Sequence, residues 1–215
     1  MLLRGLPIFL IAVLATAPAI MLAQQPLPTG PDSYRTLLTR LQAKDTTIDF
    51  TALRFALTRD SSYAPYGSAA DVHWDSLGAA LHRREFHRVL TEADSALAID
   101  YLDVRTHVLR AQAAEQLGDS SSALWDRVVA ALLVRSIQRS GAGTVDSPCV
   151  VISVREEYAL LGMTGFQRGK QALGRCARTL CDILEAENRA TGAKRTFYSD
   201  ISLPKTILDR MFQSK

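Results

Sequence analysis

A repeat with an offset of 34 residues is the feature that most constrains how this chain can fold. At that offset Val89-Leu90 corresponds to Ala123-Leu124, and Ala96 corresponds to Ala130. Apolar residues recur at helical spacing around these positions. A repeat of this length holds two helices, and each pair leaves an apolar stripe that a second pair must cover. The sequence therefore predicts stacked helix pairs.

Two such pairs are predicted between residues 74 and 136. They are Trp74–Leu81 with Glu85–Ala98, and Val104–Leu117 with Ser120–Ser136. Because 34 residues is the period of the tetratricopeptide unit, we expect these pairs to be tetratricopeptide-like. Two units are fewer than a self-supporting array needs, so other segments have to cover its ends. Two earlier helices, one capped by Asp32 or Ser33 and one capped by Asp49, are available for this.

The helical periodicity ends after the glycine-containing stretch 141–143. Cys149–Val154 is rich in β-branched residues and predicts a strand, and residues 180–202 predict a hairpin with a turn at Thr191-Gly192. A short amphipathic helix beginning at Pro204 follows. The predicted fold class is α+β, with N-terminal antiparallel helix pairs followed by a small antiparallel β-sheet.

Composition sets broad limits on the class of protein. The chain has 215 residues, 47% hydrophobic and 22% charged, which is too apolar for a disordered protein. A formal net charge of +3 argues against a dedicated nucleic-acid binder. We predict a flexible, proline-rich lead-in at residues 24–31 and one domain at 32–215, with a helical part at 32–140 and a mixed sheet part at 141–215.

Residues 1–23 have the layout of a secretory signal peptide. Arg4 is the only charge, Leu6–Leu14 is apolar, and small residues follow. Cleavage is expected after Ala23 or Ala19, and no cysteine lies near either position for lipid attachment. An uncleaved membrane anchor is the alternative, although prolines interrupt a short apolar stretch. The expected location is the bacterial periplasm or the cell exterior, with no membrane attachment after cleavage.

Three cysteines, Cys149, Cys176 and Cys181, form an odd set in a chain expected to be exported. One disulfide is compatible with this number, and at least one thiol stays free or pairs between chains. The spacing matches no zinc-ligand pattern. The sequence leaves the pairing open.

His107 is the first candidate for chemistry because it lies on an apolar helix face. A neutral core histidine that donates one hydrogen bond is the common use of such a residue. The alternative is a metal ligand or general base working with Glu156 or Glu157. On an extended chain only one of these two glutamates can point inward, and a salt bridge with Arg54 or Arg155 is the more frequent use of such a side chain.

Two further groups of residues are candidate binding sites. Tyr63 and Tyr66 flank Pro65 in a rigid aromatic loop that serves either as a lid over the core or as a ligand contact. Arg83 and Arg84 lie in a basic cluster at a turn between helices. Such clusters are ordinarily solvated, and anion binding is the alternative.

Three groups of residues resemble the signatures of one bacterial family. The first comprises Asp49–Arg54 and Tyr63–Tyr66, the second Ser136-Ile137, Ser140–Gly143 and Val151–Tyr158, and the third Asp182–Leu184, Thr191-Gly192 and Phe197–Ser202. Together they resemble the exported "domain of unknown function" family numbered 4919, over nearly the whole mature chain. The resemblance implies an exported, helix-rich α+β protein and assigns no activity.

The sequence favours a non-catalytic module of the cell envelope that binds a protein or peptide, because stacked helix pairs commonly offer a concave side to such partners. The alternative is a small metal-dependent or hydrolytic enzyme that uses His107 with Glu156 or Glu157. A stability factor without a small ligand is a third interpretation. No cofactor, dedicated metal site, nucleic acid or membrane partner is indicated.

Overall fold

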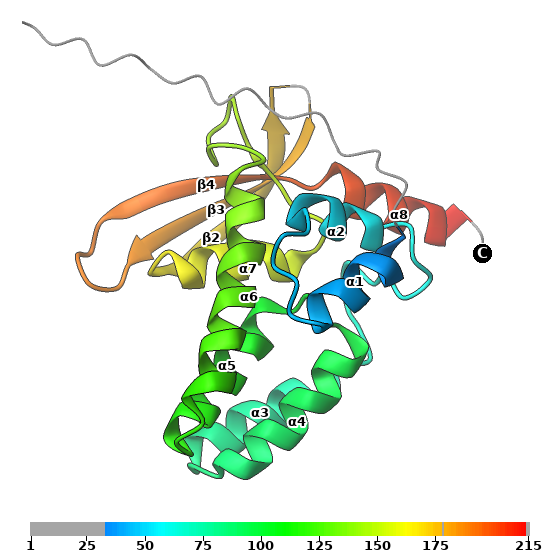
Figure 1. The fold of residues 1–215 in the computed structure, drawn as a ribbon. Helices are drawn as coiled ribbons and strands as arrows, with labels where there is room; N and C mark the ends of the chain where they lie inside the picture. The colour runs from blue at the N-terminus through cyan, green and yellow to red at the C-terminus, as the bar shows by residue number, and fades with distance from the viewer. Residues whose placement is uncertain (1–32, 178, 214–215) are drawn as a thin grey trace, which may run out of the picture.

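Six helices precede the first strand in the computed structural model, which describes residues 33–177 and 179–213 (Figure 1). They are α1 (Tyr34–Gln42), α2 (Phe50–Leu57), α3 (Asp71–His82), α4 (Phe86–Ile99), α5 (Val104–Gln116) and α6 (Ser120–Gln138). The four central helices match the predicted pairs to within a few residues at each end. The predicted signal peptide at 1–23 and lead-in at 24–31 lie outside the described residues.

Polar side chains cap several of these helices, as their sequences indicate. Ser33 accepts a hydrogen bond from the Thr36 amide at the start of α1. Asp49 accepts from two amides of α2, and Asp103 accepts from an amide of α5. These bonds satisfy backbone donors that the first helical turn leaves free. The predicted cap at Asp49 is confirmed, and Ser33 is the cap of the first helix.

Helices α3 to α6 pack in chain order, each against the next. Helix α6 begins 34 residues after α4, since their first residues are Phe86 and Ser120. A small hydrophobic core between α3, α4 and α5 consists mostly of alanine, and these small side chains let the helix backbones approach closely. Its buried members are Ala70, Leu77, Ala80, Val89, Ala93, Ala96 and Ala113. The stacking of helix pairs is confirmed, and their identity as tetratricopeptide units stays a prediction.

Four strands form one mixed sheet in the order β1-β4-β3-β2. They are β1 (Cys149–Val150), β2 (Phe166–Cys176), β3 (Thr179–Asn188) and β4 (Lys194–Asp200). The predicted hairpin is confirmed as β3 and β4, which pair antiparallel. The expectation of a wholly antiparallel sheet needs correction, because β1 pairs with β4 in parallel. The α+β fold class is as predicted.

The predicted strand Cys149–Val154 is wrong beyond its first two residues. Strand β1 ends at Val150, and helix α7 (Val154–Met163) begins four residues later. The Glu156 carboxylate accepts a hydrogen bond from the Ile152 amide and so helps to close the first turn of α7. Glu156 and Glu157 therefore lie on a helix, where both side chains are buried, and not on an extended chain with opposite faces.

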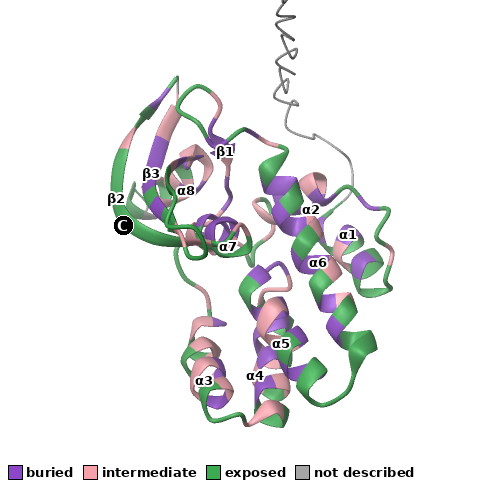
Figure 2. Ribbon diagram, turned by 90° about the vertical axis from the view of Figure 1, so that its left-hand side faces the viewer, coloured by how far each residue is buried: buried purple, intermediate pink, exposed green. Residues whose placement is uncertain are grey.

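Helix α7 lies between the helical layer and the sheet, because it contacts α5 and α6 on one side and β2 on the other (Figure 1). Strand β2 forms the outer edge and is exposed along most of its length, whereas β3 beside it is buried or half-buried at most positions (Figure 2). A final helix, α8 (Ser202–Gln213), contacts β3. It begins two residues before the predicted start at Pro204.

The larger hydrophobic core joins the helical part to the sheet. Its buried residues come from α1, α2, α6 and α7 and from strands β1, β3 and β4. Gly141 holds the connection between α6 and β1, because a Cβ at that position would lie 2.1 Å from the Pro148 carbonyl oxygen. Only glycine fits so close an approach of two backbones. No helix within the described ranges is long and apolar enough to cross a membrane.

Candidate functional site

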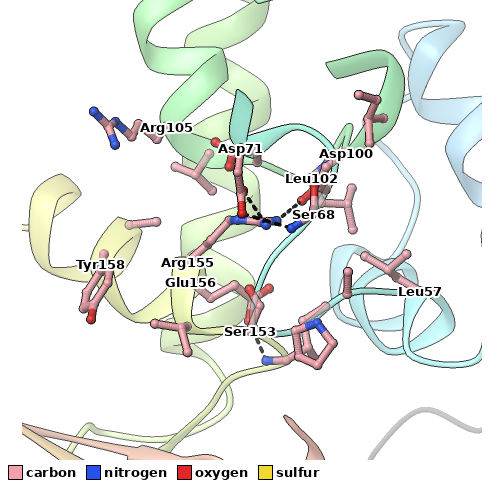
Figure 3. Close-up of a pocket in the computed structure, with 18 of the residues that line it drawn as sticks. Leu57, Ser68, Asp71, Asp100, Leu102, Arg105, Ser153, Arg155, Glu156 and Tyr158 are labelled. Atoms are coloured by element: carbon pink, nitrogen blue, oxygen red, sulfur yellow. Dashed lines mark hydrogen bonds and ion pairs between the residues drawn. The ribbon is translucent and has the colours of Figure 1, made fainter. Parts of the chain in front are cut away.

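A cavity of about 700 Å³ lies where the helical layer meets α7 (Figure 3). Three stretches that are far apart in the sequence line most of it: the loop 62–71 before α3, residues 99–109 around the start of α5, and residues 152–163, which include α7. The volume is within the range of cavities that enclose small ligands or peptide side chains. The fold thus brings a loop, a helix corner and a helix together around one space.

Apolar side chains make up much of the cavity wall. They include Leu57, Ile99, Val108, Leu109, Val154 and Met163. Gly162 of α7 also lines the cavity, and a Cβ at that position would meet nothing within 4 Å. The space beside α7 is therefore open.

Arg155 is the central polar group of the cavity (Figure 3). Its guanidinium donates to Asp100 over 2.8 Å and to Asp71 over 2.9 Å. The same group lies 4.8 Å from the centre of the Trp74 ring. Since both terminal nitrogens are occupied by carboxylates, Arg155 is held in one place and links the start of α7 to the start of α3 and the end of α4.

Two aspartates at the corner between α4 and α5 lie in a desolvated environment. Burial and the neighbouring Asp103 raise the pKa of Asp100 from 3.8 to about 6, although Arg155 opposes this shift. Burial raises the pKa of Asp103 too. Asp103 uses Oδ1 to cap α5, whereas its Oδ2 is buried and has no hydrogen-bond partner among the described residues.

The predicted binding residues Tyr63 and Tyr66 both line the cavity. The Tyr63 hydroxyl donates a short hydrogen bond to the Ile152 carbonyl, so it ties the loop to the segment before α7. Burial raises the pKa of Tyr63. Tyr66 is more exposed, at 46% of its surface. The loop therefore forms one wall of the cavity, with one tyrosine anchored and the other at its rim.

Glu156 forms a salt bridge with Arg54, which is one of the two arginine partners that the sequence suggested for it. The Arg54 Nε and one terminal nitrogen each lie 2.6 Å from a different carboxylate oxygen of Glu156. The same guanidinium donates to the Val150 carbonyl over 2.9 Å. Arg54 is 0% exposed, so this bidentate pair joins α2 to α7 inside the protein.

Glu157 lies in a different environment from its neighbour. It is 1% exposed, and its carboxyl group forms a hydrogen bond with the carboxyl group of Asp182. Burial and the nearby Asp182 carboxyl on β3 raise the pKa of Glu157 from 4.5 to about 9. Glu157 is therefore protonated at neutral pH. It does not line the cavity.

His107 is buried in the helical layer and does not line the cavity. Its Nδ1 lies 2.7 Å from Asp126 Oδ1, and its Nε2 lies 2.8 Å from the Tyr101 carbonyl oxygen. Both ring nitrogens of His107 thus face oxygen atoms inside the helical layer. Burial opposes ionisation of Asp126, but hydrogen bonds from His107 and Arg110 lower its pKa below the ordinary value.

The structure does not bring the predicted catalytic residues together by hydrogen bonds. His107 contacts Asp126 and Tyr101, Glu156 contacts Arg54 and the Ile152 amide, and Glu157 faces Asp182. Arg83 and Arg84 lie outside the cavity lining, and the exposed Arg83 pairs with Glu85. Over the ranges 33–177 and 179–213, no cluster of three or more histidine, cysteine, aspartate or glutamate side chains is arranged to hold a metal ion.

A disulfide joins Cys176 and Cys181 across the turn of the β2–β3 hairpin, which resolves the pairing that the sequence left open. Cys149 is a free, buried thiol, and burial raises its pKa to about 11. A thiol in this state is unreactive at neutral pH.

Sequence reasoning found the two tyrosines but missed the polar centre of the cavity. Asp71, Trp74 and Asp100 did not stand out as candidates, and Arg155 was considered only as a salt-bridge partner of a glutamate, because these residues come from three separate segments. The sequence did contain one signal for this polar centre. Asp100 and Asp103 lie in the same short connection between α4 and α5, and capping α5 requires only one of them.

Fold and site together define an α+β protein whose stacked helices and sheet-bound helix enclose a mainly apolar cavity. The chain matches the model of the family described as "Domain of unknown function (DUF4919)" over residues 31–210. It belongs to that family, as the sequence resemblance indicated. Neither the curated proteins nor the solved structures yielded a match.

Proposed function

We propose that this protein is a non-catalytic binding module of the bacterial cell envelope and that it holds a peptide or protein segment in the cavity beside α7. The observation that carries the proposal is the open, mainly apolar space of about 700 Å³ between three separate segments. Stacked, tetratricopeptide-like helix pairs commonly receive extended or helical peptides on such a surface.

The polar contacts also favour binding over catalysis. Arg155 and Glu156 are the charged cavity residues contributed by α7, and each is already engaged in ion pairs within the chain. The alternative, a metal-dependent or hydrolytic enzyme using His107 with Glu156 or Glu157, has less support because these side chains have other partners. A preformed cavity with fixed polar groups suits recognition.

The envelope location rests on two features. Residues 1–23 read as a cleaved signal, and the Cys176–Cys181 disulfide is of a kind that persists in oxidising compartments. Expression of the full chain in a bacterium, followed by fractionation and N-terminal sequencing, tests this location. We expect a periplasmic or secreted protein that begins at Gln24 or Ile20. An uncleaved protein in the cytoplasm would contradict the proposed export.

A cavity-filling variant tests peptide binding. Peptides selected from a random library against the mature protein are measured by titration calorimetry with the wild type and with Gly162→Leu. We expect affinity to fall about tenfold or more in Gly162→Leu, because the new side chain occupies the open space beside α7.

Gly78→Leu is the matched control for this experiment. Gly78 is also helical, and a Cβ there also meets nothing within 4 Å, but the residue does not line the cavity. We expect Gly78→Leu to bind as the wild type does. Failure to select any peptide, or equal loss of affinity in both variants, would overturn the proposed function.

A further inference from the structure

We propose that β2, the long edge strand of the sheet, binds an acidic, extended segment of a partner protein, and that this segment adds to the sheet as a further strand. No residue of β2 lines the cavity, so this surface is separate from the one in the proposed function. The edge offers the partner two things, which are backbone groups without a strand beside them and a positive charge.

The two edges of the sheet differ in how far their backbone groups are already used. Strand β1, at one edge, has two residues, and the Val150 carbonyl accepts hydrogen bonds from Arg54 and Ser140. Strand β2, at the other edge, has eleven residues, and among the described residues β3 is the strand on its inner side and none lies on its outer side (Figure 2). An edge of this length presents a row of N–H and C=O groups to which another strand can bond.

The second half of β2 is regular enough to template a strand. The register between β2 and β3 shifts between Arg168 and Gln171, but it is continuous from Gln171 to Cys176. The disulfide between Cys176 and Cys181 ties the end of this hairpin together. Because the edge is already ordered, little conformational freedom is lost from it when a strand is added.

The edge strand is positively charged. It contains Arg168, Lys170 and Arg175, which are all exposed, and no aspartate or glutamate. Arg168 contacts the hydroxyl and the ring of Tyr158 on α7. None of the three cations lies within ion-pair distance of a carboxylate in the described part of the chain. They are therefore available to carboxylates of a partner.

The acidic residues of the neighbouring strand β3 do not neutralise this edge. Asp182 is buried and hydrogen-bonded to Gln171. Glu185 and Glu187 lie one strand inward, and Lys194 of β4 is the register partner of Glu187. A strand added outside β2 meets the cations of β2 first.

Side chains along the regular stretch indicate the pattern of the partner. Gln171 faces α7, because its side chain contacts the Tyr158 hydroxyl. Strand alternation places Leu173 and Arg175 on the same face as Gln171. Leu173 is 70% exposed, so an apolar side chain of the partner can cover it while an acidic side chain two residues away meets Arg175.

The same charges argue against a second copy of this chain as the occupant. Two β2 strands side by side would bring cations close to cations, and like charges on neighbouring strands are destabilising. Lysine and arginine on edge strands commonly prevent self-association for this reason. A segment with glutamates keeps the backbone pairing and reverses the sign of the charge interaction.

Three acetylated heptapeptide amides test the inference. The acidic peptide is Thr-Glu-Thr-Val-Thr-Glu-Thr, whose symmetric sequence fits either strand direction. One control replaces both glutamates by lysine. The other, Thr-Glu-Pro-Pro-Thr-Glu-Thr, keeps the charge but removes two consecutive backbone donors, so it cannot pair as a strand. Binding to the mature protein is measured by fluorescence anisotropy at low salt. We expect the acidic peptide to bind about tenfold more tightly than either control, and its affinity to fall as salt is added.

Lys170→Glu/Arg175→Glu assigns the binding to β2. We expect this double variant to prefer the lysine peptide over the acidic one, a reversal that unfolding of the protein cannot produce. Arg135→Glu/Arg139→Glu is the matched control, because both residues are exposed and lie on or just after α6, whereas β2 packs against β3 and α7. It should keep the preference of the wild type.

Hydrogen exchange with the acidic peptide locates the bound segment. We expect slower exchange in β2 and no change with the proline-containing peptide. Gly162→Leu should bind the acidic peptide as the wild type does, because β2 lies outside the cavity.

Each departure from these results overturns the inference. Failure of the acidic peptide to bind, or equal affinity for the acidic and lysine peptides, overturns the charge recognition. Equal affinity for the acidic and proline-containing peptides overturns strand addition. Weaker binding in Gly162→Leu would place the acidic peptide in the cavity instead of on β2. The library selection decides separately whether the cavity binds peptides.

Discussion

At the scale of single residues, Glu157 makes the stability of the protein fall as the pH rises from about 5 to about 9. Its pKa is about 9 in the folded protein and 4.5 in an exposed glutamate, so the folded state holds the proton more tightly. The resulting stabilisation is complete below the lower pKa and is lost as the pH rises through the higher one. Relative to the wild type, Glu157→Gln should gain stability between pH 5 and pH 9, by up to about 1.4 kcal/mol per pH unit.

Chemical denaturation at a series of pH values measures this difference. Glu185→Gln is the control, because Glu185 lies on β3, the strand that carries Asp182, and is exposed. Its stability should follow that of the wild type. If the free energies of unfolding of the wild type and of Glu157→Gln differ by the same amount at every pH, Glu157 is ionised in the folded protein and the prediction is wrong.

The buried pair of Arg54 and Glu156 gives a second prediction at the same scale. Arg54→Met leaves an unpaired carboxylate inside the protein and should reduce the free energy of unfolding by about 3–5 kcal/mol. The double variant Arg54→Met/Glu156→Met should be closer to the wild type, because both charges are removed. Urea denaturation of the single and double variants checks this. Additive effects would mean that the two residues do not interact.

Residue roles were only partly predictable from the sequence. Burial of His107 follows from its place on an apolar helix face, and the pairing of Glu156 with Arg54 follows from the rarity of unpaired buried charges. Asp126 could not be assigned to His107, because the contact depends on how α5 and α6 pack. The polar centre around Arg155 depends in the same way on the relative positions of three segments.

At the scale of elements, the alanine-rich contact between α3, α4 and α5 should be sensitive to lost volume. Leu77 is 0% exposed and belongs to that small core. Leu77→Ala should lower the free energy of unfolding by about 2–5 kcal/mol through loss of buried surface and creation of a cavity. Leu124→Ala on α6 is the control, since Leu124 is 62% exposed. Equal effects of both substitutions on the melting transition would contradict this packing.

The β2–β3 hairpin carries a prediction about its disulfide. The bridge between Cys176 and Cys181 closes a loop of few residues, so Cys176→Ala/Cys181→Ala should cost only about 2 kcal/mol of stability. Peptide mapping of the unreduced protein should find these two cysteines linked, with one thiol at Cys149 titratable after denaturation. A bridge that involves Cys149 would refute the assigned pairing.

The helices were more predictable than the sheet. The four central helices have strong apolar periodicity and polar caps, so their limits could be read to within a few residues. Strand β2 gave no such signal, because an edge strand that is exposed on most residues lacks alternation. The run Cys149–Val154 looked like a strand because β-branched residues dominate it, but the strand ends at Val150 and Val154 is already the first residue of α7.

At the scale of the whole molecule, α7 connects the two parts that the sequence treated separately. It packs against α5, α6 and β2, and its residues supply one wall of the cavity. The cavity therefore exists only when α7 is packed against the helical layer. Its presence could not be predicted, since α7 itself was not expected.

Hydrogen exchange tests the central claim, that this junction is where a peptide binds. Backbone exchange is measured by mass spectrometry with and without a library-selected peptide at saturating concentration. The account predicts slower exchange in the segments 62–71, 99–109 and 152–163, which line the cavity, and unchanged exchange in β2 and in the turn after α5. Protection confined to the outer face of the sheet, or no protection in any of the three segments, would contradict it.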